Sequence, residues 1–396
     1  MDASLLIWLL LPVAAASGWF AATRTARSVS RRRARADLAS EYFKGINYVL
    51  NEQPDKAIEV FIKVLEVDAE TLETHLALGN LYRRRGEVDR AIRIHQNLAA
   101  RSTASDEQRY EALLELAQDY LSAGLLDRAE NLFRELVEAD RHTVQALHQL
   151  IDIYEQEKDW DEAVVVARRL GQITGSPLDN AVAQYRCEQA EQAREQGRHA
   201  EALELVVAAR QSFPDCARAS IIEGDIHAAL GAPAAALEAY ARVEHQDPDY
   251  VPEVVERTLD AFEALDAPER ARDYLERMHV GRGGMTALLA LAERVREEKG
   301  AAQAAELVVT ALSHRPTLRG FEWLLELYAA DEAEPRANAL NAQQWSILQR
   351  LTVALLKDRP VYKCGHCGFP AKLLHWRCPG CKHWNSVRPI HGVEGE

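Results

Sequence analysis

The sequence predicts an all-α fold, a superhelical solenoid of paired helices, with a transmembrane helix before it and a small β ribbon after it. Three observations predict this order: twenty uncharged residues at 3–22, small residues that recur every 34 positions, and two Cys-x-x-Cys pairs near the end. They divide the chain into a membrane anchor, a basic juxtamembrane segment, an array of about nine helical units and a metal-binding ribbon, at 1–23, 24–37, 38–357 and 358–396.

The first segment has the length and composition of a membrane-spanning helix. Residues 3–22 carry no charge, and twenty helical residues rise about 30 Å, the thickness of the hydrocarbon core. Pro12 and Gly18 are compatible with this reading because both residue types are tolerated in transmembrane helices. The chain is therefore predicted to cross a membrane once.

A cleaved signal peptide is the alternative, since residues 14–16 are three alanines that resemble a cleavage site. A signal peptide carries its basic residues before the apolar run, whereas here only Met1 and Asp2 precede it. The basic residues follow the run: Arg24, Arg27, Arg31, Arg32, Arg33 and Arg35. Arginine-rich flanks stay in the cytoplasm, so the rest of the chain is predicted to lie there, with the N-terminus outside.

The central segment repeats with the period of a tetratricopeptide array. Equivalent alanines lie 34 residues apart, as in the pairs Ala57 and Ala91, Ala129 and Ala163, Ala202 and Ala236, and Ala271 and Ala305. Glycines at the predicted turns between helices keep the same register: Gly86, Gly124, Gly197, Gly231 and Gly300. Six repeats are clear, two weaker ones lie around 252–280 and 285–316, and a degenerate pair extends to Leu356. Such a stack predicts a concave groove.

Charge and motifs exclude several function classes. Residues 36–358 hold 35 basic and 58 acidic residues, a net charge of −23, which makes the array a poor surface for nucleic acid. The sequence contains no phosphate-binding glycine loop, no His-Glu-x-x-His motif and no nucleophile elbow. Histidines of the array are interpreted as packing or groove residues: His75, His95, His148 and His227. The chain is not expected to be an enzyme.

The C-terminal cysteines have the spacing of a tetrahedral metal site. Cys364-Gly-His-Cys367 and Cys378-Pro-Gly-Cys381 are two short turns separated by ten residues. Four thiolates complete the coordination sphere of zinc and leave no position for water, so the site is predicted to be structural. The two remaining cysteines, Cys187 and Cys216, are expected to be unpaired small residues of the core, as in a reducing compartment.

Disulfide bonds and iron binding are the alternatives for these cysteines. Disulfides are disfavoured because a cystine within Cys-x-x-Cys belongs to a thioredoxin-like unit, which the sequence lacks. Iron remains open, since tetrahedral sulfur suits either metal. His366, His375 and His383 lie nearby and offer alternative ligands, but four cysteines already suffice.

Repeat position also predicts groove and docking residues. The inward face of the first helix of each repeat is expected to include Asn80, Arg83, Arg84, Gln118, Asp152 and Glu155, with a solvated helix face as the alternative for each of them. Residues 358–360 alone separate the array from the ribbon, and three residues span at most about 11 Å. The ribbon is therefore predicted to lie against the terminal helices, and metal binding to fix the shape of the groove through that contact.

These modules, in this order, resemble the lipopolysaccharide assembly protein B family of Gram-negative bacteria. The resemblance covers the full length, and its most specific part is a rubredoxin-like ribbon reading YKCGHCGF at 362–369 and WRCPGCKHW at 376–384. It implies an adaptor in the bacterial inner membrane, with a periplasmic N-terminus, that regulates lipopolysaccharide synthesis. The partners it implies are the deacetylase LpxC, the membrane protease FtsH and membrane proteins that sense or transport lipopolysaccharide; the ligands it implies are Cys364, Cys367, Cys378 and Cys381.

Two further classes remain possible from the sequence alone. The ribbon could bind iron and carry electrons, or the array could be a general assembly scaffold unrelated to lipopolysaccharide. Pairing of solenoid ends or of membrane helices would make a homodimer unsurprising.

Overall fold

The computed structural model describes most of the chain after the predicted anchor. Described are residues 40–67, 72–101, 105–280, 284–330, 342–357, 359–393 and 395. The predicted membrane segment at 3–22 and its six arginines lie outside these ranges. Within the described ranges, no helix combines the length and the apolar composition that a membrane crossing needs.

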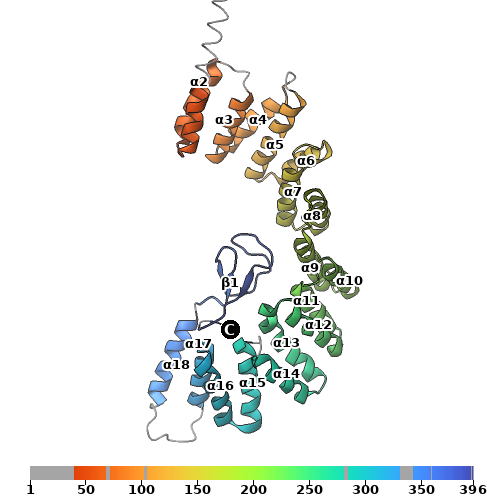
Figure 1. Ribbon diagram of the computed structural model, residues 1–396, viewed down its shortest axis with the longest axis vertical. Coiled ribbons are helices and arrows are strands. Elements are labelled where there is room, and N and C mark those ends of the chain that lie inside the picture. The colour runs from red at the N-terminus through yellow and green to blue at the C-terminus, as the bar shows by residue number, and fades with distance from the viewer. Residues whose placement is uncertain are drawn as a thin grey trace, which may run out of the picture. The chain divides into compact units, whose positions relative to one another are not determined.

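The helices form two compact units, residues 1–153 and 154–396. A helical stretch at 40–50 opens the first unit. It is followed by α2 (Pro54–Val67), α3 (Leu72–Arg84), α4 (Val88–Ala99), α5 (Asp106–Ser122) and α6 (Leu126–Glu138), and α7 (Thr143–Glu157) crosses the boundary between the units (Figure 1).

The second unit continues the pairs and ends in the ribbon (Figure 1). Its helices are α8 (Trp160–Thr174), α9 (Asp179–Glu195), α10 (His199–Ser212), α11 (Ala217–Ala229), α12 (Pro233–Gln246), the short 3-10 helix η1 (Pro248–Tyr250), α13 (Val251–Ala264), α14 (Pro268–Val280), α15 (Gly284–Lys299), α16 (Ala301–His314), α17 (Leu318–Ala330) and α18 (Ala342–Leu356). The two weaker repeats are therefore regular pairs, α13 with α14 and α15 with α16, and the all-α repeat prediction is confirmed for the array.

The predicted turn glycines all adopt left-handed backbone angles, with φ between 71° and 93° at the five positions. This conformation strains residues with a Cβ atom. Where the sequence lacks a glycine, another residue takes the same conformation, such as Lys158 between α7 and α8 (φ 59°) and Asp266 between α13 and α14 (φ 50°). The turn geometry is thus common to pairs with and without glycine.

Small residues let the two helices of a pair approach closely. A Cβ atom on Gly224 would lie 2.2 Å from the ring of Tyr240, and one on Gly79 would lie 2.3 Å from the ring of His95. The alanines that define the repeat are buried; Ala57, Ala91, Ala129, Ala163, Ala202 and Ala236 have no exposed surface. Close helix packing therefore explains why small residues recur at equivalent positions of the repeat.

Capping residues set several helix starts. Ser105 and Gln108 form a capping box before α5, in which each side chain accepts a bond from the other's backbone N–H. Asp159 accepts from the backbone N–H of Glu162 at the start of α8.

Cys187 and Cys216 are buried in the core between α9 and α11 as free thiols, as predicted.

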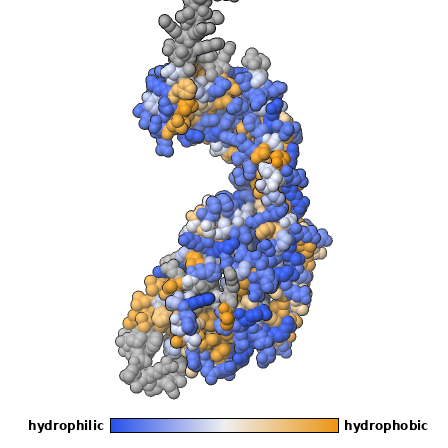
Figure 2. All heavy atoms as spheres, in the orientation of Figure 1, coloured by the Kyte–Doolittle hydropathy of each residue, from blue (hydrophilic) through white to orange (hydrophobic). Residues whose placement is uncertain are grey.

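The last helix leaves an apolar face uncovered. Ile347, Leu351 and Leu355 follow one another at helical spacing on α18, and their side chains are 40%, 56% and 54% exposed. Figure 2 shows apolar surface over this end of the second unit. No described repeat follows α18 to cover this face.

The ribbon is a three-stranded antiparallel sheet with β1 (Tyr362–Cys364) between β2 (Pro370–Ala371) and β3 (Val387–Pro389). Tyr362 pairs with Ala371 on one side and with Pro389 on the other. So small a sheet has little core of its own, since Cys364, Cys378 and Val387 are the buried residues of its cluster.

Candidate metal centre and its docking surface

The ribbon brings the four predicted cysteines to one point. Their sulfur atoms all lie within 4.8 Å of one another. The Sγ atoms of Cys364 and Cys381 are 3.7 Å apart, and so are those of Cys367 and Cys378. Cys364 and Cys378 are buried, whereas Cys367 is exposed.

The two cysteine turns have matching backbones. The N–H of Gly368 donates to the carbonyl of Cys364, and the N–H of Lys382 donates to the carbonyl of Cys378, both at 2.9 Å. In each turn, the residue after the second cysteine has a left-handed backbone conformation, with φ 78° at Gly368 and 62° at Lys382. This shared curl points both thiols of a turn to the same side.

The sulfur geometry fits a tetrahedral metal ion. Four sulfurs at the Zn–S distance of about 2.3 Å stand about 3.8 Å apart, close to the two separations of 3.7 Å. Disulfide bonds need about 2.05 Å, and all four cysteines are free. Burial raises the pKa of the Cys364 thiol, but its hydrogen bond with the Ser386 hydroxyl and bonds from the N–H groups of Cys367 and His366 lower the pKa to about 5. The donor set therefore suits a thiophilic divalent cation.

Two of the three neighbouring histidines lie beside the site. The rings of His366 and His383 stack with their centroids 3.7 Å apart, and together with Cys381 they form a second group of adjacent donor atoms. Nδ1 of His383 lies 3.0 Å from the carbonyl oxygen of Cys381. Both histidines are exposed.

Glu155 is the main anchor of the ribbon on the array. Its carboxylate accepts bonds from the indole N–H of Trp384 and the hydroxyl of Tyr185, each at 2.7 Å, and pairs with Arg377. Glu155 is only 8% exposed. The Trp384 ring meets Tyr185 and Trp160 edge-on, with centroids 5.8 and 6.1 Å away. Helices α7, α8 and α9 thus share one pocket for the second cysteine turn.

A second set of contacts joins the ribbon to η1. The Tyr250 hydroxyl donates to the carbonyl of Val387 at 3.0 Å, and its ring packs on Trp376 with centroids 4.9 Å apart. Arg388 forms ion pairs with Asp247 and Asp249.

Further contacts on both sides extend this surface. Tyr362 donates to Glu253 of α13, and the guanidinium of Arg218 in α11 lies over the Trp376 ring. Burial raises the pKa of Tyr250, so the hydroxyl stays protonated as a donor. The ribbon therefore contacts α7, η1, α11 and α13 through side chains of the second unit (Figure 1).

The linker-based docking prediction was only partly right. The ribbon does contact the terminal helices, through the N–H of Leu318 to the carbonyl of Val393 and through Lys372 to the carbonyl of Lys357. Its buried contacts, however, are with residues of α7, α9, α11 and η1. A short linker restrains only the first residues of the ribbon, whereas buried charge and aromatic packing decide where the rest lies.

Known proteins share both parts of the chain. Residues 114–177, 187–251 and 74–109 match tetratricopeptide repeats, and residues 362–389 match a rubredoxin metal binding domain. Lipopolysaccharide assembly protein B of Escherichia coli (strain K12) is 35% identical over 390 residues, covering 98% of this chain and 99% of the relative. The protein of the same name from Haemophilus influenzae is 32% identical over 401 residues, with the same coverage.

The chain belongs to the lipopolysaccharide assembly protein B family. A solved tetratricopeptide repeat protein from Parabacteroides merdae is also similar, with a TM-score of 0.34, 15% identity and coverage of 61% of this chain and 92% of that one. Family membership and the repeat fold make this protein a scaffold or adaptor and not an enzyme.

Three of the predicted groove residues of this family member meet in one hydrogen-bond network. Arg83 donates to Asn80 at 2.8 Å and to Gln118 at 3.0 Å, and it pairs with Glu115 and with the fully buried Asp119. The other carboxylate oxygen of Asp119 lies 2.5 Å from Nδ1 of His95. The cation of Arg83 is therefore neutralised within the first unit.

The other predicted groove residues have different positions. Arg84 and Asp152 are exposed, whereas Glu155 is buried beneath the ribbon. Asp119 was missed as a site residue, although its place one residue after Gln118 is a sequence signal for the helix face next to the groove. The ribbon's own docking residues, Arg377 and Arg388, were also missed.

Proposed function

We propose that this protein is a membrane-anchored cytoplasmic adaptor of lipopolysaccharide assembly in the bacterial inner membrane. The observation that carries the proposal is the likeness to lipopolysaccharide assembly protein B over 98% of the chain. The uncharged run at 3–22 and the six arginines after it support the anchor and its orientation.

In its finer form, the proposal is that the adaptor presents the deacetylase LpxC to the protease FtsH. A repeat array suits this task because it offers a long surface for two partners at once. Membrane proteins that sense or transport lipopolysaccharide would then restrain it. These partners follow from the family resemblance.

The centre is proposed to hold one zinc ion on Cys364, Cys367, Cys378 and Cys381. Zinc would replace the missing hydrophobic core of a sheet this small. Metal analysis of the purified chain, with a visible absorption spectrum, tests the assignment. Stoichiometric zinc in a colourless sample supports it, and a coloured iron protein would favour the electron-carrier alternative.

The partner groove is proposed to lie on the inward helices of the first unit. The ribbon contacts α7, η1 and α13, whereas the predicted groove residues Asn80, Arg83 and Gln118 lie on α3 and α5 of the first unit. The network around Arg83 would keep this surface rigid, and the exposed Arg84 would contact the partner.

Metal binding is proposed to support partner binding through ribbon docking. The double substitution Cys378→Ser with Cys381→Ser should release the metal, increase proteolysis after residue 358 and reduce partner capture. Glu155→Gln is the matched variant, because it weakens docking and leaves all four thiols in place. Full partner capture by the double mutant would contradict the coupling.

The function itself is tested in cells and by capture. Depletion of the protein should raise the abundance of the deacetylase, and affinity capture from solubilised membranes should recover both the deacetylase and the protease. Unchanged deacetylase on depletion, with capture of unrelated assemblies, would favour the general scaffold.

A further inference from the structure

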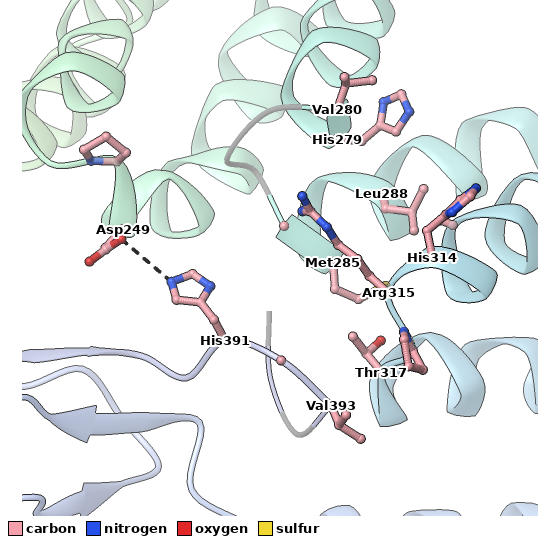
Figure 3. Close-up of a pocket in the computed structure, with 15 residues that line it drawn as sticks. Asp249, His279, Val280, Met285, Leu288, His314, Arg315, Thr317, His391 and Val393 are labelled. Carbon is pink, nitrogen blue, oxygen red and sulfur yellow. Dashed lines mark ion pairs between the residues drawn. The ribbon is translucent and has the colours of Figure 1, made fainter.

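A cavity separate from the metal centre lies on the second unit, with a volume of about 810 Å³. It is bounded by the ends of α14 and α16, the starts of α15 and α17, η1 and the C-terminal tail (Figure 3). Small-molecule sites in proteins have volumes of about 300–1,000 Å³. None of the four cysteines lines this cavity.

One arginine and three histidines are among the side chains that line the cavity. Figure 3 shows the side chains of His279, His314, Arg315 and His391 arranged around it. Arg315 forms no ion pair with any residue that the structure describes.

Asp249 is the acidic residue among the described lining residues, and it is already engaged. It pairs with Arg388, and one of its oxygens lies 3.8 Å from Nε2 of His391. Among the residues that the structure describes, Arg315 therefore has no carboxylate partner at this cavity.

The remaining walls are apolar. Met285 and Leu288 are buried beneath the cavity, at 5% and 4% exposure, whereas Val280 and Val393 at its rim are 75% and 55% exposed. Apolar surface left open beside a free guanidinium suits a ligand that carries both kinds of group.

We propose that this cavity binds an anionic amphiphile, a molecule with one phosphate or carboxylate group next to an apolar chain. Arg315 receives the anion in charge-assisted hydrogen bonds, with imidazole N–H groups as further donors. The chain of the ligand lies over Met285 between Val280 and Val393. Because Val393 accepts a bond from the N–H of Leu318 at 2.8 Å, the ligand would also bridge the repeats and the tail that follows the ribbon.

Binding is tested with the full chain in nanodiscs of neutral lipid, by calorimetry with decyl phosphate below its micellar concentration. Inorganic phosphate and decanol are measured beside it, because each carries only one of the two groups of decyl phosphate. Decyl phosphate should bind saturably and more tightly than either. Equal binding of decanol, or the absence of saturable binding, would overturn the proposal.

Two variants separate the two halves of the ligand. Arg315→Ala should lower the affinity for decyl phosphate by about tenfold, the effect of one lost charge-assisted hydrogen bond. The affinity for decanol should not change. Val280→Ser, at an exposed position that tolerates substitution, should lower the affinity for decyl phosphate and for decanol. It should not change the affinity for inorganic phosphate. Arg272→Ala is the control, since Arg272 pairs with Glu276 and Glu298 away from the cavity. Unchanged decyl phosphate affinity in Arg315→Ala would refute the site.

The lipid composition of the nanodisc distinguishes a membrane lipid from a soluble amphiphile as the ligand. If phosphatidic acid in the nanodisc competes with decyl phosphate in the wild type but not in Arg315→Ala, the cavity takes a lipid headgroup. If it does not compete, the ligand is a soluble amphiphile. Both results presuppose the Arg315-dependent binding described above.

Discussion

At the residue scale, Glu155 of α7 is a buried contact between the helical array and the ribbon. Its carboxylate accepts from Tyr185 and Trp384 and pairs with Arg377, which joins α7, α9 and the second cysteine turn. Because the group is buried, its loss would leave a guanidinium and two donors without an acceptor.

We therefore predict that Glu155→Ala lowers the free energy of unfolding by roughly 3 kcal/mol and exposes the ribbon to protease. Urea unfolding and limited proteolysis measure the two effects. Glu195→Ala, at an exposed position of α9, is the control and should stay within about 0.5 kcal/mol of wild type. An unchanged midpoint for Glu155→Ala would mean that the ribbon is held elsewhere.

The left-handed turn residues allow a second prediction at this scale. Lys158 has φ 59° at a position where other repeats have glycine, such as Gly197 with φ 74°. Lys158→Gly should raise the free energy of unfolding by about 0.5–1 kcal/mol, and Gly197→Ala should lower it by about 1 kcal/mol. Opposite shifts of the urea midpoint would verify this, and shifts of the same sign would count against it.

At the element scale, α3, α4 and α5 are joined by one buried polar network. Asp119 of α5 bridges Arg83 of α3 and His95 of α4 with no exposed surface of its own. Asp119→Ala should lower the stability of these helices by roughly 3 kcal/mol, because an arginine would lose its buried partner. Amide hydrogen exchange should show faster exchange in α3 and α5, with α15 and α16 unaffected.

The exposed neighbour Arg84 provides the matched test of the groove. Arg84→Ala should leave the urea midpoint within about 0.5 kcal/mol of wild type, since it buries no charge. It should nevertheless reduce partner capture. Normal capture by this variant, with a folded first unit, would place the partner surface elsewhere.

At the scale of the whole molecule, topology is the decisive question for the adaptor role. The arginines after residue 22 predict that the array and the ribbon face the cytoplasm. A reporter enzyme that works only in the cytoplasm should be active when it is fused after residue 396, and one that works only outside the cytoplasm should be inactive there. Protease added outside the inner membrane should not cut the array. A C-terminus outside the cytoplasm would exclude the adaptor role.

Local features of the fold could be predicted from the sequence because each depends on neighbours in the chain. The 34-residue period reports the packing of two consecutive helices, so Ala57 and Ala91 reveal their burial by spacing alone. The cysteine turns are equally local, since the curl at Gly368 and Lys382 follows each Cys-x-x-Cys. The two turns are close in sequence, so their meeting could be anticipated as well.

Contacts between distant residues were decided by the tertiary structure alone. Glu155 meets Arg377 and Trp384 across more than two hundred residues, and Tyr250 meets Val387 across 137. No periodicity couples such positions, because their partners are chosen by the three-dimensional course of the solenoid. For the same reason Glu155 was expected in an open groove, and only the folded chain shows it buried beneath the ribbon, where desolvation makes its paired donors necessary.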